Sequence, residues 1–355
     1  MSIDYNKAPF PWFGGKRDAA PAIWAALGDV VHYVDPFCGS LAALLLRPHP
    51  CNRTYHSETV NDADGFLVNA WRSIQLAPEE AAEWASWPVS EADLHARHLW
   101  LLKWAANRNL EALMGDPDWR DPRAAGYWLW GISSWIGSGW CSGKGPWVVG
   151  SDGRIEKRGR PGVRRQRPHL SDDGKGVNRP QLREPGVGDE PDFHPMTMPE
   201  LRLWFRFLSA RLRHVRIING DWRRVCTNGA LKILSARNDP GKRVGAFLDP
   251  PYSMDVRADC YSVDSPGLSA DVREWCAANG DKPWLRIVLA GFEGEGHESL
   301  EGLGWRAVEW FKSGFLKGGY AQQSAGGGNQ RRERLWLSPH CADEADRVEE
   351  QGRLF

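Results

Sequence analysis

The sequence predicts an α/β protein: one open, mostly parallel sheet into which a second, mainly helical region is inserted. Short β-branched or aromatic runs alternate with helical stretches in the first and last thirds of the chain, an order typical of a parallel sheet covered by helices. The middle of the chain is instead helical and then rich in Gly, Pro and Arg. A length of 355 residues leaves room for both regions.

Seven strands are expected, each a short apolar run that ends in a turn. They lie at residues 30–34, 53–60, 214–218, 244–248, 285–289, 307–311 and 334–338. Between them, residues 41–46 and 66–74 favour helix, and a longer amphipathic helix is expected at 198–212.

The region between the second and third strands has a different composition. Residues 78–125 read as Trp-rich helix, whereas 148–195 form a tract that cannot bury enough apolar surface for a core and is expected to be loop, hairpin or conditionally ordered. We therefore expect a sheet domain in two parts, an inserted region and a C-terminal tail. Their boundaries are 1–75 and 213–340, 76–212, and 341–355.

Charge and composition exclude several classes of protein. The formal net charge is zero, from 45 Lys and Arg against 45 Asp and Glu, which argues against a uniformly basic nucleic-acid binder. Residues 151–183 nevertheless hold ten basic and four acidic side chains, a local surplus of 10 − 4 = +6 that favours phosphates. The sequence has no long apolar run and no leader pattern, so we expect a cytoplasmic protein with no membrane partner. Seven scattered cysteines without a C-x-x-C pair indicate reduced thiols and no metal site.

The most specific motif is Asp249-Pro250-Pro251-Tyr252, directly after the apolar run 244–248. Ligands of open α/β sheets bind at the carboxyl ends of strands. Two prolines fix the turn and remove two N–H donors, which leaves a stiff edge of acceptors. That edge suits an exocyclic amino group on a planar heterocycle, with Tyr252 stacking on the ring. A simple turn after a strand is the alternative reading of these four residues.

Three ordered motifs together resemble the Dam-like class of adenine-N6 DNA methyltransferases, which includes members encoded by phages. They are Pro11-Trp12-Phe13-Gly14-Gly15-Lys16, Asp35-Pro36-Phe37-Cys38-Gly39-Ser40, and Asp249–Tyr252. The resemblance covers roughly residues 10–75 and 214–340. It implies a class I methyltransferase fold, with a mixed seven-stranded sheet, helices on both faces, and an inserted, mainly helical domain that recognises the DNA target.

The resemblance also implies a set of residues that bind S-adenosylmethionine. They are Trp12, Lys16, Asp35, Phe37, Gly39, Asp62 and Asp221. Asp62 would hold the ribose hydroxyls, with Asn61 and Glu58 as competitors for that role, and Asp221 would contact the adenine. Lys16 would reach the cofactor and the catalytic edge. Taken singly, Lys16 could be a surface lysine, and Asp35 and Asp221 could merely cap the segments that follow them.

The cofactor loop departs from the family at one position. Members commonly read Phe-x-Gly-x-Gly, whereas Leu41 replaces the second glycine here. If this position requires φ > 0, leucine costs about 1–2 kcal/mol or shifts the loop. An inactive homologue that still binds DNA is therefore an alternative.

The inserted region is the expected reader of double-stranded DNA. Its candidate contacts are Trp140, Lys144, Arg154, Arg158, Arg164, Arg165 and Arg167; a solvated basic loop without a partner is the alternative. The expected reaction is methyl transfer from S-adenosylmethionine to N6 of a flipped-out adenine. A methyltransferase that acts on RNA adenine or another planar amine is the competing enzyme, and a nicotinamide-dependent oxidoreductase is disfavoured because the Gly-x-Gly-x-x-Gly motif is missing. A restriction endonuclease is a possible partner, and a monomer is favoured although the sequence leaves the oligomeric state open.

Overall fold

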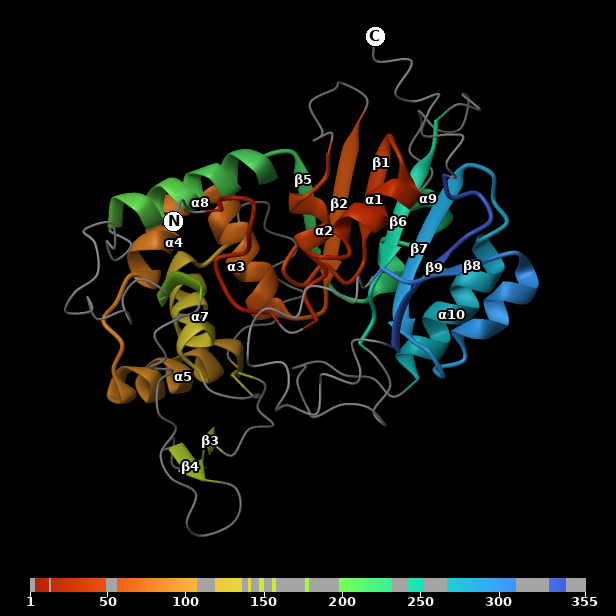
Figure 1. Ribbon diagram of the computed structural model, residues 1–355. Helices are drawn as coiled ribbons and strands as arrows, with labels where there is room; N and C mark the ends of the chain where they lie inside the picture. The colour runs from red at the N-terminus through yellow and green to blue at the C-terminus, as the bar shows by residue number, and fades with distance from the viewer. Residues whose placement is uncertain are drawn as a thin grey trace, which may run out of the picture. The chain divides into compact units, whose positions relative to one another are not determined.

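The computed structural model describes residues 4–12, 14–48, 56–106, 119–135, 140–141, 147–149, 155–157, 176–178, 198–231, 242–251, 267–310 and 332–342. The chain divides into two compact units. A helical unit contains the N-terminal segment as far as Gly14 and residues Asp62–Arg213. A sheet unit contains Gly15–Asn61 and the described chain from His214 onward (Figure 1).

In the described chain, seven strands form one mixed sheet in the order β5-β2-β1-β6-β7-β9-β8. Their bounds are β1 His32–Asp35, β2 Ser57–Asp62, β5 Val215–Asn219, β6 Val244–Leu248, β7 Leu285–Phe292, β8 Arg306–Val308 and β9 Glu333–Leu337. β1 is parallel to β2 and β6, and β6 is parallel to β7. β9 is antiparallel to both β7 and β8. The expected α/β class with a mixed seven-stranded sheet is confirmed, and the fold is consistent with a Rossmann-like arrangement.

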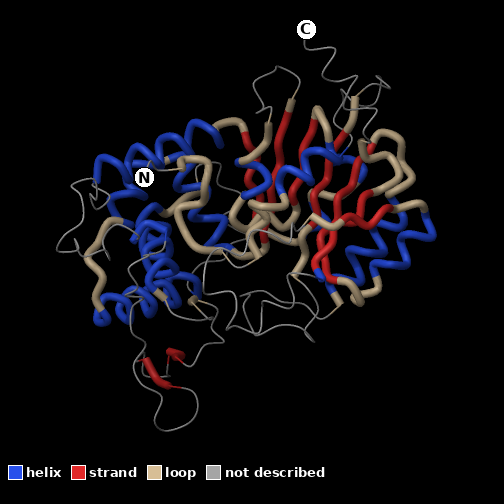
Figure 2. Tube along the Cα trace, in the orientation of Figure 1, coloured by secondary structure: helices blue, strands red, loops and turns tan. Residues whose placement is uncertain are grey.

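Helices cover both faces of the sheet (Figure 2). Because side chains alternate along a strand, Val244, Ala246 and Leu248 of β6 point into a core shared with α10 (Leu268–Asn279). Gly245 faces the other way, where an added Cβ would lie only 3.0–3.3 Å from Val30 and from Leu27 of α1 (Ala20–Leu27). The remaining described helices of this unit are α2 Ala42–Leu45, η2 Trp222–Arg224, α9 Asn228–Leu231 and η4 His297–Leu303.

The helical unit is held together largely by tryptophan. Its elements are α3 Gly65–Leu76, α4 Pro78–Ala85, α5 Glu91–Ala106, α7 Pro122–Ser134, α8 Met198–Leu212, the antiparallel pair β3 Trp147–Val149 and β4 Ile155–Lys157, and η1 Gly176–Asn178. Trp71, Trp128 and Trp130 are almost completely buried. Asp121 begins α7 by accepting the Ala124 N–H at 3.0 Å and also accepts the Trp104 Nε1–H at 2.8 Å. A large share of the tryptophan in the sequence therefore fills this core.

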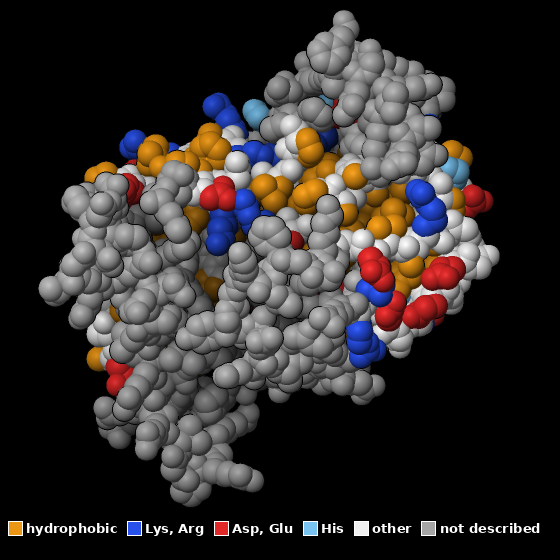
Figure 3. All heavy atoms as spheres, in the orientation of Figure 1, with side chains coloured by type: hydrophobic (Ala, Val, Ile, Leu, Met, Phe, Trp, Pro, Cys, Tyr) orange, Lys and Arg blue, Asp and Glu red, His pale blue; other side chains and the backbone are white. Residues whose placement is uncertain are grey.

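The contact boundary between the units lies at residues 61 and 62 rather than at 75 and 76. α3 packs against α7 and α8, so it belongs to the helical unit instead of closing the first part of the sheet. No helix in the described ranges is both long and apolar enough to cross a bilayer. Charged side chains of both signs are interspersed on the described surface of the face shown in Figure 3.

A buried histidine lies in the tryptophan core of the helical unit. His98 of α5 is 4% exposed, and its ring centroid lies 5.1 Å from that of Trp135 and 5.0 Å from that of Trp140. Neither ring nitrogen has a hydrogen-bond partner in the described structure. Burial, and secondarily the charge of His95, lowers the pKa of His98 to about 4. In the sheet unit, burial and then Arg216 lower the pKa of His32 to about 3.

These two histidines predict a loss of stability in mild acid. Both pKa values are lowered on folding, so the unfolded chain takes up protons first, as the pH falls below about 6.5. Stability is therefore retained above that pH and lost between it and about 4 for His98 and about 3 for His32. Each histidine contributes a slope of at most about 1.4 kcal/mol per pH unit.

Chemical unfolding at pH 7 and pH 5 should show this dependence of stability on pH. His98→Phe should reduce this slope, and an unchanged slope in that variant would contradict the assignment.

Candidate active site at the carboxyl edge of the sheet

The candidate site lies where the strand order reverses. From β1 the chain proceeds outward through β2 to β5 and then returns to β6 on the other side of β1. β1 and β6 are parallel neighbours, so the segments after Asp35 and Leu248 leave the same edge next to each other. Such a reversal point is where open α/β sheets bind their ligands. The motifs that begin at Asp35 and Asp249 flank it.

Asn61 ties together the loops that follow β1 and β5. Its side-chain Nδ2 donates to the backbone carbonyl oxygens of Pro36 and Gly220, each at 3.0 Å. The backbone carbonyl of Asn61 accepts the Cys38 N–H at 2.9 Å. The side chain is buried, and its Oδ1 has no hydrogen-bond partner in the described structure. Sequence reasoning treated Asn61 only as a competitor for the ribose. Its three hydrogen-bond partners lie near it only because of the strand order, so the residue type alone could not predict these contacts.

The other candidates from β2 have local roles. Asp62 ends the strand, and its Oδ1 accepts the Asp64 N–H at 2.9 Å, just before α3 begins. The carboxylate of Glu58 faces Arg47 at 3.1 Å, and both side chains are 1% exposed. Glu58 is therefore part of a buried ion pair inside the sheet unit, which removes it as a candidate for the ribose.

Asp35 is buried and shapes its own loop. Its carboxylate accepts the Phe37 N–H at 3.3 Å and the Tyr33 hydroxyl at 3.2 Å. Burial, and then the negative charge of Asp35, raises the pKa of Tyr33 well above its ordinary value, so the phenol stays protonated and donates. The Phe37 ring contacts Trp222 at a centroid distance of 5.8 Å. The loop thus packs directly against the segment that contains Asp221.

Leu41 adopts the backbone conformation that glycine favours. Its φ and ψ are 56° and 22°, in the left-handed region, and Gly39 nearby has φ 45°. Position 41 therefore does require φ > 0, and the presence of leucine there costs about 1–2 kcal/mol in backbone strain. The Leu41 side chain is fully buried, which offsets that cost by roughly 1.5–3 kcal/mol. The loop keeps its turn although the glycine is absent.

Lys16 lies against the aspartate of the proline motif. It follows a turn in which Gly14 has φ 72°, and its Nζ lies 2.8 Å from Asp249 Oδ2 and 3.0 Å from Glu333 Oε1. The side chains of these three residues are 4%, 18% and 10% exposed. Pro250 is buried and Pro251 is half-buried, whereas Tyr252 lies outside the described residues. Sequence reasoning missed Glu333, because only the antiparallel pairing of β9 with β7 brings this acid to the site.

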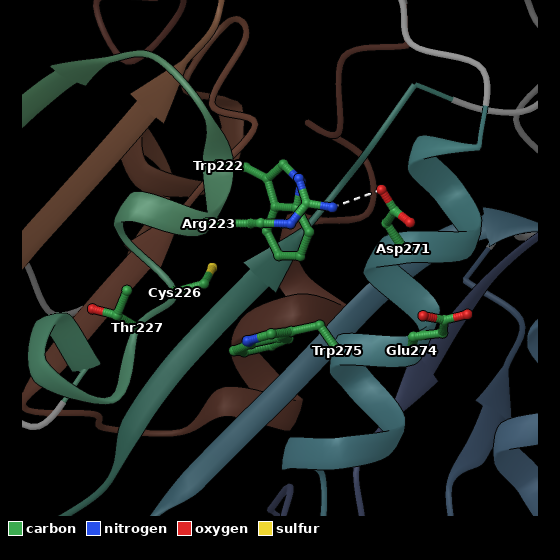
Figure 4. A pocket seen from close by; sticks show the side chains of 7 residues that line it. All are labelled: Trp222, Arg223, Cys226, Thr227, Asp271, Glu274 and Trp275. Carbon is green, nitrogen blue, oxygen red and sulfur yellow. Dashed lines mark hydrogen bonds and ion pairs between the residues drawn. The ribbon is translucent and has the colours of Figure 1, made fainter.

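A cleft opens beside Asp221. It has a volume of about 430 Å³ and is lined by Trp222, Arg223, Cys226, Thr227, Asp271, Glu274 and Trp275 (Figure 4). Arg223 forms one wall and pairs with Asp271 at 2.6 Å and with Asp221 at 3.3 Å. Trp222 and Trp275 meet edge to face at 6.2 Å. Burial raises the pKa of Cys226 to about 12, so its thiol stays protonated. The cleft offers aromatic surface and hydrogen-bonding groups to a planar, polar ligand.

The candidates Trp12 and Trp140 belong to the helical unit. Trp12 packs edge to face against Phe10 at 5.9 Å. Trp140 is 8% exposed and donates its Nε1–H to the Trp128 carbonyl at 3.2 Å, so any part that it takes in DNA binding is indirect. The predicted DNA contacts Lys144, Arg154, Arg158, Arg164, Arg165 and Arg167 lie outside the described residues.

The described part of the chain holds no cluster of three or more His, Cys, Asp or Glu residues that could bind a metal ion. In comparisons with known proteins, the chain matches no protein-family model and no curated protein significantly.

Proposed function

We propose that the protein is a site-specific DNA methyltransferase that transfers a methyl group from S-adenosylmethionine to N6 of adenine. The observation that carries the proposal is the contact of Lys16 with Asp249 at the point where the strand order reverses. The motif that ends at Lys16 and the motif that begins at Asp249 lie far apart in the sequence but are in contact in the fold. The resemblance implies that Lys16 reaches this catalytic edge. Catalytic and ligand-binding groups of α/β sheets gather at such an edge.

The strand order supports the class I methyltransferase fold. Numbered along the chain within the sheet, the order is 3-2-1-4-5-7-6. The first five positions follow the doubly wound nucleotide-binding order, and the antiparallel β9 lies between β7 and β8. This is the mixed, mostly parallel sheet that the resemblance implies, and the helical unit occupies the position in the chain of the expected recognition domain.

The residues at this edge fit S-adenosylmethionine. Asp221 and the aromatic cleft beside it suit an adenine ring, and the buried Oδ1 of Asn61 is an acceptor without a partner in the described structure. The Asp35 loop would hold the amino-acid end through its backbone N–H groups, and Asp62 would hold the ribose. When bound, S-adenosylmethionine supplies an electrophilic methyl group on a sulfonium.

The chain's own part in the reaction is to bind and orient the amino group. The Asp249 carboxylate and the Pro250 carbonyl would accept its two N–H bonds, which favours a pyramidal nitrogen with a localised lone pair. Tyr252 would stack on the extruded base, and Lys16 would fix the Asp249 carboxylate. Extrusion costs a few kcal/mol of stacking and pairing, which basic contacts to phosphate in residues 151–183 would offset.

The test is transfer of tritiated methyl groups from S-adenosylmethionine to DNA of varied sequence. Wild-type protein should label DNA, and long-read sequencing of DNA from expressing cells should place N6-methyladenine at one recurrent site. RNase and protease treatment separate RNA adenine and protein amides from DNA as the acceptor. No label in any substrate, with no cofactor binding by calorimetry but retained duplex binding, would favour the alternative of an inactive DNA-binding homologue, which Leu41 motivates.

A further inference from the structure

Lys16 is shared by two carboxylates, and only one of them belongs to a motif that the proposed reaction uses. Its ammonium lies 2.8 Å from Asp249 and 3.0 Å from Glu333. Lys16 is 4% exposed, and a lysine buried to that degree requires charge partners to remain protonated. The two acids come from different strands, β6 and β9, so two independent elements fix its position.

The backbone of β9 directs Glu333 toward Lys16. Glu333 pairs with Phe292 of β7, and its neighbour Arg334 points to the opposite face of the strand. Arg334 binds Glu293 and Glu309, each at 2.9 Å, and Arg332 donates to the Glu293 carbonyl at 2.7 Å. The cations adjacent along the strand therefore have acidic and carbonyl partners of their own.

We infer that Glu333 is a positioning residue that holds Lys16 beside Asp249 while Asp249 binds the substrate amino group. This inference rests on the proposed function. If Asp249 were the sole partner of Lys16, turning its carboxylate toward a substrate N–H would weaken the compensation of a buried charge. Glu333 keeps that charge compensated, so the Asp249 oxygens can reorient at lower cost. Glu333 itself does not touch the substrate.

Glu333→Gln tests this role, because it removes the charge and nearly preserves the shape. We expect kcat to fall by about tenfold to a hundredfold, the scale of misplacing a reacting group, with KM for S-adenosylmethionine within about twofold of wild type. Removing one of two neighbouring negative charges makes it easier to keep Asp249 ionised. The acidic limb of the pH–rate profile should therefore move to lower pH, and Glu333→Asp, which restores the charge, should return it.

Glu293→Gln is the matched control. It removes a carboxylate from the same group of strands, but one that binds Arg334 instead of Lys16, and its pH–rate profile should superimpose on that of the wild type. The inference is overturned if Glu333→Gln loses activity only in proportion to its folded fraction and keeps the wild-type profile. That outcome would assign Glu333 a structural role alone.

A cycle of Lys16→Met, Glu333→Gln and the double variant separates this inference from the proposed function. If wild-type protein labels no substrate, the proposed function fails, but thermal unfolding of the cycle still reports whether the two residues are coupled. We expect the double variant to lose less stability than the two single losses added together. Additive losses would show that Glu333 does not hold Lys16, whatever the protein does.

Discussion

Asp249→Asn should reduce methyl transfer by about 10²–10³-fold while leaving S-adenosylmethionine binding within a fewfold of wild type. Preorganised groups aimed at a reacting centre contribute on this scale. Asparagine keeps the size of the side chain but turns one acceptor oxygen into an N–H donor, which would face the amino group of adenine. It also removes one charge partner of Lys16, whose Nζ lies 2.8 Å from Asp249 Oδ2.

The measurement is a single-turnover assay with tritiated cofactor, paired with calorimetry of cofactor binding. Asp281→Asn is the control for loss of one exposed carboxylate, because the Asp281 side chain is 99% exposed and faces His340 at 3.5 Å, outside the lining of the cleft. Equal rates for Asp249→Asn and wild type would reject Asp249 as the residue that binds the amino group.

Lys16→Met should lower the free energy of unfolding by roughly 3 kcal/mol at pH 7, the lower end of the range for breaking a buried ion pair. Removing the ammonium leaves the Asp249 and Glu333 carboxylates, which are only 18% and 10% exposed, without the positive charge that both contact.

Denaturant unfolding at pH 7 measures this loss of stability. Lys103→Met provides a comparison, because Lys103 is an exposed lysine on α5. Its loss should stay within about 0.5 kcal/mol, as is usual for surface positions. A Lys16→Met variant that is as stable as wild type would mean that the Lys16 contacts contribute nothing to folding.

The strands were the most predictable part of the fold, because each is a short apolar run with a turn at its end. The run at 244–248 became β6 with the same bounds, whereas the run at 285–289 continues to Phe292. That extension includes Ala290 and Gly291, residues of low strand propensity that are held by pairing with β9. Local pattern could not predict it, since the pairing partner lies far along the chain.

The candidate site was predictable only as far as motifs that stand next to strands. Asp249 stood out because two prolines follow it directly after a strand, whereas Lys16 and Asp35 were implied only by the resemblance; the structure places Lys16 against Asp249. Glu333 and the bridging role of Asn61 depend on which strands are neighbours, which no local spacing encodes. Local pattern also gave no sign that Trp140, predicted as a DNA contact, packs against His98 and Trp135 in a core.

The position of β9 has a consequence for synthesis of the protein. Residue 16 leaves the ribosome 333 − 16 = 317 residues ahead of residue 333, and the two are in contact in the folded sheet unit. A nascent chain that stops before β9 lacks one of the acids that compensate the buried ammonium. The contact of Lys16 with both acids should therefore be completed only after β9 has been synthesised and has paired with β7.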